Sequence, residues 1–549
     1  MPRVNTLPQE RFQLVLLLLF NAQLLKSKKM KNKIYYFFLL LLLTTSSCEK
    51  YLKEDPKGLM SPDTYFKSAS DGKAAITGIY ALLKNNSMYG QLGLYAYYEM
   101  GADIAESNRS FTSITPMCNY SFNESNSDVS DQKMGITVTW KDCYRVILNA
   151  NIILSKVEGN PAISKVDQDA IIGETLFLRS LMYYHLTNLW GDVPYYRGVL
   201  TITELSTLGR ISSVKIRDEI LQDLQRAQDL MPAAIVAKEN GRASKWAAAM
   251  TMAKIYLIQK KWQLARDKCL EIINNSGHKL LSTYGEVFDP NKEYNAETIW
   301  ELDFALNVNS QYEKGVPTIA GNGNWFPSMF CPRLLDEPKT STDKNALIAA
   351  LAKNGENFNG TGAQVGLPDF ISKFPINDLR RPYNIKQQYE GINLVWSYFP
   401  KMWNLSVATS PRFNHSDNIL IYRLADTYLM AAEAENELNG PANAYQYIHP
   451  IRKRAYVTQA EWELTGLSKD QFRSALQDER KWELACEGHR RMDLIRWGIL
   501  LDVVKKTAYK VHAPSANILP RNVLFPIPLQ EIILNPNLLK SDPTNNGYR

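Results

Sequence analysis

The chain has 549 residues, of which 45% are hydrophobic and 11% aromatic, so it can bury a large core and does not have the composition of a disordered protein. Most of its formal net charge of +7 comes from residues 1–47, which carry seven of the 63 basic and one of the 56 acidic residues; the remainder holds 56 basic against 55 acidic residues. Residues 48–549 therefore have a net charge of +1, which gives no electrostatic reason to expect nucleic-acid binding.

Residues 30–47 have the layout of a secretory signal peptide. Lys31 and Lys33 form a positive segment, an apolar run covers 34–43, and small residues then lead to Cys48. The apolar run is shorter than the roughly 20 residues that a membrane-spanning helix needs. A Cys in this place is similar to a bacterial lipoprotein signal, which implies that Cys48 becomes the acylated N-terminus; the alternative is a short anchor with a Cys there by chance.

A second apolar run, "LVLLLLF" at 14–20, precedes this signal. We interpret residues 1–29 as an upstream extension, with Met30 as the true start. The alternative is a membrane hairpin of two helices, for which neither apolar run is long enough.

The first predicted helices lie in the first half of the chain. Apolar residues recur at intervals of three and four over 139–157, which indicates a helix with one stripe toward a core. The next helical pattern, over 167–195, is ended by Gly191 and Pro194. A third helix is predicted over about 212–230.

Two segments, 241–277 and 422–455, predict helical hairpins. Each contains two helical stripes separated by a short break, "QKK" in the first and "NGPA" in the second, and small residues fill the predicted contact faces. Two antiparallel helices packed through alanines are typical of a tetratricopeptide-type hairpin. We therefore predict a mainly α fold in which such hairpins form a scaffold, with long irregular loop-rich insertions and little β structure.

The irregular regions 85–135 and 285–415 hold the candidate ligand-binding residues. Long loops are usually functional or disordered, and the aromatic content here argues against disorder. Sugar sites place ring faces on aromatic side chains and hydroxyls on polar ones. The candidates are Trp325, Phe326, Asn324, Phe111, Asn108, Arg109, Tyr97 and Trp396, with Tyr89, Tyr95 and Trp403 as further aromatic side chains. The alternative for each aromatic is a loop side chain that fills the core.

The six Cys and six His residues give little support for a metal site. None of the cysteines has CxxC spacing and no HExxH is present, so we predict no metal, no cofactor and no dense disulfide framework. Cys269 and Cys486 lie in helical patterns and are predicted to be buried.

The segment "ERKWELACEGHRRMDLIRWG" at 479–498 combines carboxylates with arginines. Three of its glutamates are four positions apart, which would place them on one side of a helix, and paired carboxylates could serve a glycosidase. The spacing also predicts the ion pairs Glu487–Arg491 and Asp493–Arg496. We interpret the segment as a structural ion-pair helix with no catalytic residue, in a protein that is not an enzyme. Its charged members are Glu479, Arg480, Glu483, Glu487, Arg490, Asp493 and Arg496.

Several ordered segments resemble the SusD/RagB family of outer-membrane nutrient-binding lipoproteins. They are "CEKYLKEDP" (48–56), "ETLFLRSLMYYHLTNLWGDVPY" (174–195), "RLADTYLMAAEAENELNG" (423–440), the segment 479–498, "FPIPLQEIILNPNL" (525–538) and "NNGY" (545–548). Lys53 departs from the pattern, since many relatives have an acidic residue there. Together these segments span almost all of the chain after Cys48.

The resemblance implies a fold, a location and a function. The fold would be a single SusD-like domain over 48–549, with helical hairpins in 48–280, a loop-rich binding part in 285–415 and a helical part in 416–549. Its Cys48 lipid would be its only attachment to the outer membrane, where it would face the cell exterior. The partner would be a SusC-like TonB-dependent transporter, and the cargo an oligosaccharide or, in some relatives, a peptide. The alternatives are a tetratricopeptide-type interaction scaffold and a glycoside hydrolase.

Overall fold

Antiparallel α-helices make up most of the computed structural model, which describes residues 65–108, 115–125, 135–234, 240–305, 324–338, 340–358, 360–405 and 415–549. The predicted extension 1–29, the signal peptide 30–47 and Cys48 lie outside these residues. Contacts among the described residues join the part of the chain from Pro62 to Arg549 into one compact unit.

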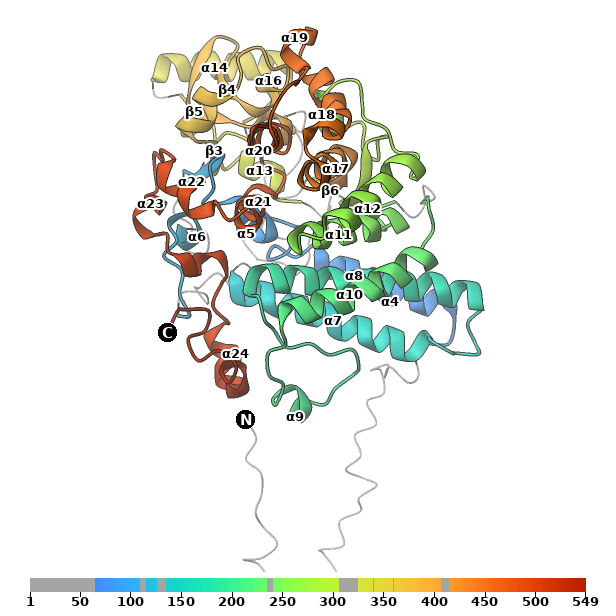
Figure 1. Ribbon diagram of the computed structural model, residues 1–549. Coiled ribbons are helices and arrows are strands. Elements are labelled where there is room, and N and C mark those ends of the chain that lie inside the picture. Colours follow the sequence, from blue (N-terminus) through green and yellow to red (C-terminus); the bar gives the residue numbers. More distant parts are fainter. Residues whose placement is uncertain are drawn as a thin grey trace, which may run out of the picture. The chain divides into compact units, whose positions relative to one another are not determined.

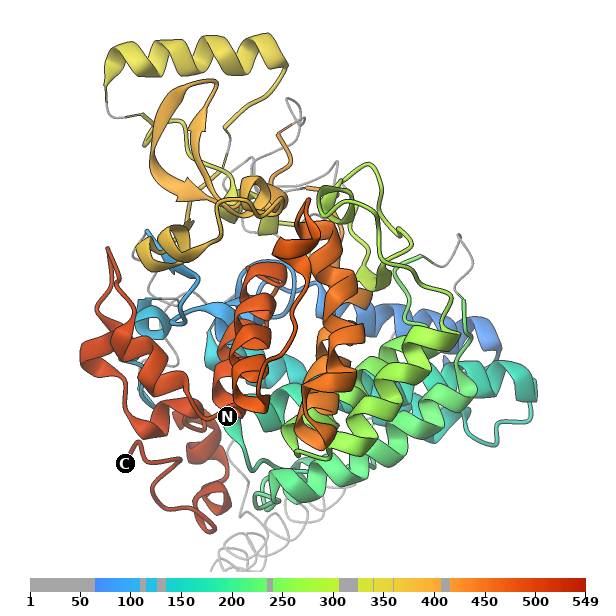
Figure 2. The ribbon, with the colours of Figure 1, turned by 45° about the horizontal axis from the view of Figure 1, so that its top comes forward.

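The long helices pack against one another in succession. They are α4 (Ala69–Leu83), α7 (Ile136–Val157), α8 (Lys165–Trp190), α10 (Ser213–Leu230), α11 (Lys245–Ile258), α12 (Trp262–Asn275), α14 (Ser341–Asn354), α17 (Leu424–Asn439), α18 (Pro441–Ala455) and α20 (Lys469–Glu483). Helices α7, α8, α10, α11, α12, α17 and α18 each contact the next, as Figures 1 and 2 show. We call this series the helical stack. It confirms the predicted mainly α fold and both predicted hairpins, α11–α12 and α17–α18.

Small side chains let the helices of the stack approach closely. Ala247, Ala248, Ala249 and Ala253 on α11 are all fully buried. Helix α8 is buried along almost its whole length from Ile171 to Trp190, because α4, α7, α10 and α11 all contact it. It ends where Gly191 takes a positive φ of 72°, a conformation that favours glycine.

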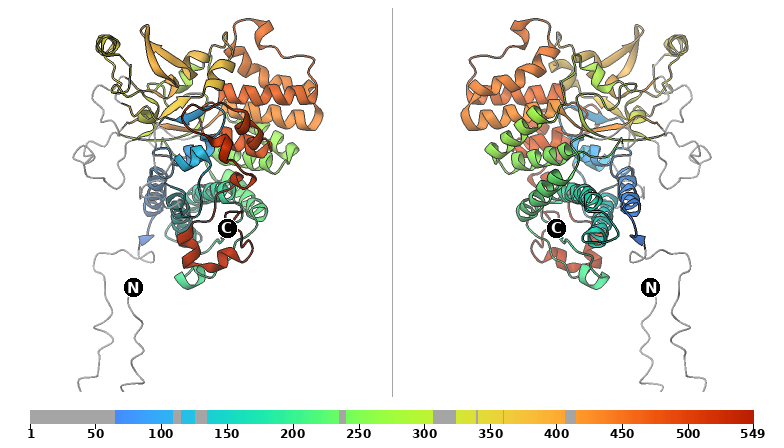
Figure 3. Two further views of the ribbon diagram at one scale, coloured as in Figure 1. Left: turned by 90° about the vertical axis from the view of Figure 1, so that its left-hand side faces the viewer. Right: turned by 90° about the vertical axis from the view of Figure 1, so that its right-hand side faces the viewer.

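The stack contains a large insertion, because α12 contacts α17 although residues 276–423 separate them. The insertion was predicted to have little regular structure, but it includes helix α14 and short strands. Strands in the described residues form three antiparallel pairs: β1 (Ala105–Ser107), from the first irregular region, with β3 (Gln364–Gly366), β2 (Thr298–Leu302) with β6 (Ile419–Arg423), and β4 (Lys386–Tyr389) with β5 (Ile392–Tyr398). The hairpin β4–β5 turns at Glu390 and Gly391, both with positive φ, as two-residue hairpins prefer. Figure 3 shows α14 and this hairpin at the end of the unit away from α7 and α8.

Short helices connect these parts. They are α5 (Gly93–Glu99), α6 (Thr115–Asn119), α9 (Ile202–Leu205), η3 (Gly285–Phe288), α13 (Phe326–Phe330), α15 (Pro368–Lys373), α16 (Arg381–Asn384), η5 (Pro400–Met402), α19 (Gln459–Trp462), α21 (Arg490–Arg496), α22 (Leu500–Lys506), α23 (Pro514–Asn517), η6 (Pro520–Val523), α24 (Leu529–Leu534) and η7 (Pro536–Leu539). Helix α21 packs on α5, and α23 packs on α6, so the C-terminal segment contacts the first irregular region.

The single helix predicted over 479–498 is wrong. Helix α20 ends at Glu483 and α21 begins at Arg490, and we call the six residues between them, 484–489, the signature turn. Cys486 with φ of 61° and Gly488 with φ of 74° reverse the chain there. Cys486 is buried, as predicted, but in a turn rather than a helix, whereas Cys269 is buried on α12.

The described residues contain no helix with the length and apolarity needed to cross a membrane. Cys118, Cys143, Cys269, Cys331 and Cys486 are buried, and none of them forms a disulfide bond within the described parts of the chain.

Candidate functional site

A cavity of about 220 Å³ lies where the helical stack meets the insertion. We call it the central cavity. Its walls come from α5, α8 and α11 on the side of the stack, from η3, β2, α13, η5 and β6, and from the signature turn. Its volume is far above the roughly 10–15 Å³ that one water needs, so it has room for a small ligand group.

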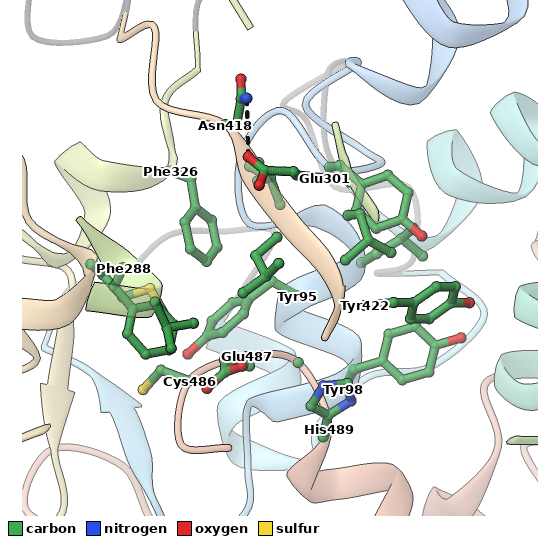
Figure 4. Close-up of a pocket in the computed structure, with 18 of the residues that line it drawn as sticks. Tyr95, Tyr98, Phe288, Glu301, Phe326, Asn418, Tyr422, Cys486, Glu487 and His489 are labelled. Carbon is green, nitrogen blue, oxygen red and sulfur yellow. Dashed lines mark hydrogen bonds between the residues drawn. The ribbon is translucent and has the colours of Figure 1, made fainter. Parts of the chain in front are cut away.

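Aromatic side chains form much of the wall of the central cavity. Tyr95 and Tyr98 are three positions apart on α5, so both rings lie on the same face of this helix. Figure 4 shows Phe326 and Phe288 on one side of the space and Tyr98 and Tyr422 on the other. Such a wall offers ring faces and edges to the C–H groups of a sugar.

His185 on α8 fixes two of the tyrosine hydroxyls. The Tyr98 hydroxyl lies 2.7 Å from His185 Nδ1, and the Tyr89 hydroxyl lies 2.8 Å from His185 Nε2. Burial lowers the pKa of His185 to about 3, so the ring is neutral. A neutral imidazole has one donor and one acceptor nitrogen, so one tyrosine donates its proton to the ring and the other accepts one.

One wall of the central cavity is acidic. Glu293 accepts a hydrogen bond from the backbone nitrogen of Asn418 at 2.7 Å, and Glu301 accepts one from the Asn418 side chain at 3.1 Å. Burial, then the nearby carboxylates of Glu301, Asp417 and Asp303, raise the pKa of Glu293 to about 7. A carboxyl group that is partly protonated near neutral pH can both donate and accept hydrogen bonds.

The signature turn forms the opposite wall, where Figure 4 shows Cys486, Glu487 and His489 facing the space. Glu99 on α5 holds this turn. Its Oε1 accepts from the backbone nitrogen of Cys486 at 3.1 Å, and its Oε2 accepts from the backbone nitrogens of His489 and Arg490. The carboxylate therefore satisfies three backbone donors that the break between the helices leaves free.

Behind the signature turn, Glu483 is the centre of a buried ion-pair network. Its carboxylate contacts Arg380 at 2.9 Å, Arg423 at 2.6 Å and Arg454 at 2.5 Å. These arginines hold the pKa of Glu483 well below its ordinary value, against the opposing effect of burial. Arg380 also contacts Glu479 at 2.6 Å, so both glutamates of α20 share one arginine.

The predicted pair Glu487–Arg491 does not form. Glu487 lies beyond the end of α20, so a spacing of four no longer brings it to Arg491. It contacts Lys401 at 2.8 Å and Arg423 at 2.6 Å, whereas the Arg491 guanidinium donates to the backbone oxygens of Tyr97 and Asn522.

The other charges of the segment pair across elements. Arg496 contacts Asp493 at 2.8 Å, as the spacing of three predicts, and also Glu433 on α17. The remaining pairs are Arg480 with Asp493 at 2.7 Å and Asp426 at 2.9 Å, and Arg490 with Asp103 at 2.7 Å. Each of these arginines forms at least one ion pair with a carboxylate outside its own helix.

Of the predicted binding residues, Asn324 and Phe326 line the central cavity. Asn324 is buried: its side-chain oxygen accepts from the backbone nitrogen of Phe326, and its amide donates to the backbone oxygen of Asp417. Trp325 is half-buried, and its backbone nitrogen donates to the Gly90 oxygen at 3.1 Å. This contact joins the two irregular regions at the cavity.

The other predicted residues do not line the central cavity. Tyr97 is 3% exposed and its ring packs on Phe525 in the core, which is the alternative that the sequence left open for each aromatic. Trp396 is half-buried on β5 with the Lys510 ammonium 4.1 Å from its ring centre. Asn108 follows β1 and its backbone nitrogen donates to the Ala363 oxygen. Arg109 and Phe111 lie outside the described residues.

Tyr98, Tyr422, Phe288 and His489 line the central cavity and were missed from sequence. For Tyr98 a signal was present, since it shares the face of Tyr95 in "YAYYE" whereas Tyr97 points elsewhere on the same helix. Tyr422, Phe288 and His489 reach the cavity only through tertiary contacts. Tyr95 and Trp403, which the sequence analysis named as further aromatic side chains, also line it.

No group of three or more His, Cys, Asp or Glu side chains in the described parts of the chain has the arrangement of a metal site.

Comparison with known proteins decides the family. The chain is 56% identical over 510 residues to SusD-like protein P25 of Formosa agariphila, which covers 92% of this chain and 97% of the relative. The protein belongs to the SusD-like family. The model of the SusD family matches residues 377–548, and a second model, described as starch-binding associating with outer membrane, matches residues 59–257.

Solved structures share this fold. A laminarin-binding SusD-like protein superposes with a TM-score of 0.69 at 24% identity and covers 86% of this chain and 98% of its own. Surface glycan-binding protein A of Bacteroides thetaiotaomicron, in complex with laminarihexaose, gives a TM-score of 0.68 at 19% identity and covers 87% and 100%.

Proposed function

We propose that this SusD-like protein binds a nutrient oligosaccharide in the central cavity, at the cell surface. The observation that carries the proposal is the combination of aromatic walls with the hydrogen-bonding side chains of Glu293, Glu301 and Asn418 in the wall of one cavity. The names of structural neighbours, which bind laminarin or laminarihexaose, support a glycan as the ligand class.

The proposal includes an anchor and a partner. The lipid would be on Cys48, after removal of the signal peptide, and would attach the protein to the outer membrane. The family model described as associating with the outer membrane supports this location. The bound oligosaccharide would then pass to a SusC-like TonB-dependent transporter.

We further propose that the protein acts by binding and not by catalysis. The carboxylates of the segment 479–498 that drew attention as a possible acid and base are Glu483 and Glu487. Glu483 is fully buried among three arginines, and Glu487 is paired with Lys401 and Arg423. Cations hold the pKa of both below its ordinary value, which is unsuited to a general acid at neutral pH.

The proposal is tested by calorimetric titration of the protein from residue 49 onward, without its lipid, against a panel of saccharides. The panel contains laminarihexaose, starch oligosaccharides, and uronic-acid-containing and sulfated oligosaccharides, with peptides as a separate arm. Saturable binding of one saccharide class with no change in its chain length is expected. Binding of peptides alone, or release of shorter saccharides, would contradict the proposal.

A further inference from the structure

The signature turn presents His489 to the central cavity. The side chain is half-buried and lies next to Tyr98 at the end of the space opposite Asn418 and Glu301 (Figure 4). Among the described residues, no hydrogen bond involves either of its ring nitrogens, and His489 precedes α21 without a side-chain cap to that helix. The ring nitrogens are therefore not used in hydrogen bonds to the described parts of the chain.

The protonation state of His489 suits a hydroxyl ligand. Burial lowers its pKa to about 4; the cations of Lys254 and Arg480 act in the same direction, and the carboxylates of Asp426 and Glu487 oppose them. A neutral imidazole offers one donor and one acceptor, and a sugar hydroxyl is likewise both donor and acceptor.

A second polar group points to the same end of the central cavity. The Tyr95 hydroxyl is buried beside the Cys486 thiol and makes no hydrogen bond to oxygen or nitrogen in the described parts of the chain. A thiol is a weak partner, so this hydroxyl lacks a strong acceptor. Two other tyrosine hydroxyls of the wall have hydrogen-bond partners. The Tyr98 hydroxyl bonds His185 Nδ1, and the Tyr422 hydroxyl lies 3.0 Å from Thr251 Oγ1. A buried hydroxyl without a partner is costly, and a ligand hydroxyl would remove that cost.

The backbone of the signature turn is held from two sides. Glu99 accepts hydrogen bonds from the backbone nitrogens of Cys486 and His489 in the turn and of Arg490 at the start of α21. Arg423 binds both Glu483 before the turn and Glu487 within it. A binding group on a fixed backbone loses little conformational freedom when it meets its ligand. The ion-pair network thus gives His489 a defined position.

We propose that the signature turn is a ligand-binding loop, in which His489 hydrogen-bonds a hydroxyl of the bound saccharide and the Tyr95 hydroxyl bonds a second one. The inference rests on the proposed function and adds the residues that recognise the sugar. It divides the segment 479–498 into two helices that form the frame and a turn that contacts the ligand.

The test compares two substitutions of similar size, His489→Leu and His489→Gln, with laminarihexaose and with the tightest-binding oligosaccharide of the panel above. Leucine removes both hydrogen-bonding groups, whereas glutamine keeps a donor and an acceptor. We expect His489→Leu to weaken affinity roughly tenfold and His489→Gln to retain most of it. Tyr95→Phe, which removes one oxygen atom, should weaken affinity several-fold.

Thermal unfolding of each variant separates binding from folding. Equal melting temperatures with reduced affinity would support the inference. Saccharide binding by the wild type that both His489→Leu and Tyr95→Phe leave unchanged would overturn the inference and leave the proposed function standing. A wild type that binds no saccharide of the panel would overturn both.

Discussion

The carboxylate of Glu99 accepts a hydrogen bond from the backbone nitrogen of His489 at 3.2 Å, across 390 positions of sequence. Glu99 is fully buried at the end of α5, the helix that carries Tyr95 and Tyr98. One side chain therefore fixes the signature turn to the helix that supplies two tyrosines of the cavity wall.

Substitution Glu99→Gln tests this link. Glutamine keeps one acceptor but turns an NH₂ group toward backbone N–H donors, so we expect a loss of about 1–3 kcal/mol in the free energy of unfolding and weaker saccharide binding. Denaturant unfolding and calorimetric titration measure the two effects. Glu158→Gln is the matched control, because Glu158 forms an exposed pair with Arg226 and should change stability by less than about 1 kcal/mol. Equal effects of the two substitutions would contradict the link.

Substitution Glu483→Gln should lower stability more than affinity. It leaves Arg380, Arg423 and Arg454 without their shared carboxylate in the interior, and loss of one partner of a buried ion pair costs about 3–5 kcal/mol. Glu483 does not line the central cavity. Urea unfolding and titration with saccharide separate the two quantities, and an affinity loss with unchanged unfolding would show that the network acts on the ligand directly.

Substitution Phe326→Ala should weaken saccharide binding by about 1–3 kcal/mol, because it removes a ring from the wall of the central cavity. The ring centre of Phe326 lies 5.2 Å from that of Tyr95, so loss of the Phe326 ring also removes an edge-to-face contact. Trp396→Ala is the comparison, since Trp396 does not line the central cavity and should leave affinity unchanged. The reverse result in calorimetric titration would place the site near β5.

Titration of Glu293 should make the free energy of unfolding depend on pH. Its pKa in the folded state is about 7, above the ordinary 4.5, so between these values the folded state binds more protons than the unfolded state. The contribution of Glu293 to the free energy of unfolding therefore falls as pH rises from about 4.5 to about 7. Glu293→Gln cannot titrate and should flatten this slope without removing it, because Glu99 also has a pKa of about 7. Unfolding curves across this pH range with identical slopes would contradict the assignment.

Substitution Cys48→Ala should release the protein from membranes, because it removes the sulfur that would carry the lipid. Cell fractionation followed by immunoblotting measures the membrane-bound share. Cys118→Ala is the control variant. Because Cys118 is buried within α6, the protein with this substitution should remain in the membrane fraction. Continued membrane attachment of Cys48→Ala would mean that another segment anchors the chain.

The helical stack could be predicted from sequence because its signals are local. Periodicity, the Gly191 end of α8 and the small residues of α11 lie within single segments, and the structure confirms the helices that they indicate. The break in 479–498 was missed because Leu484, Ala485 and Cys486 have no helix-breaking character and Gly488 was not taken as a helix end. The contact of the Cys486 backbone nitrogen with Glu99, which stabilises the turn, spans 387 positions of sequence.

The central cavity could be predicted only in part. Composition drew attention to the irregular region around Asn324 and Phe326, and both residues line the central cavity. Tyr422 and His489 belong to segments whose sequence indicates a helical hairpin and an ion-pair helix. Their approach to the cavity depends on contacts between β2 and β6 and between α5 and α21, which no local pattern encodes.

The contact between α12 and α17 has a consequence for how the protein can vary. The free energy of closing a flexible loop rises by only about 0.6 kcal/mol for each doubling of its length. Since α12 contacts α17 across residues 276–423, loops of this stretch that do not touch the stack can lengthen or shorten while the two helices keep their contact. Arg380 and Lys401 of the same stretch pair with Glu483 and Glu487, so the positions that hold the signature turn should stay fixed while the remainder varies.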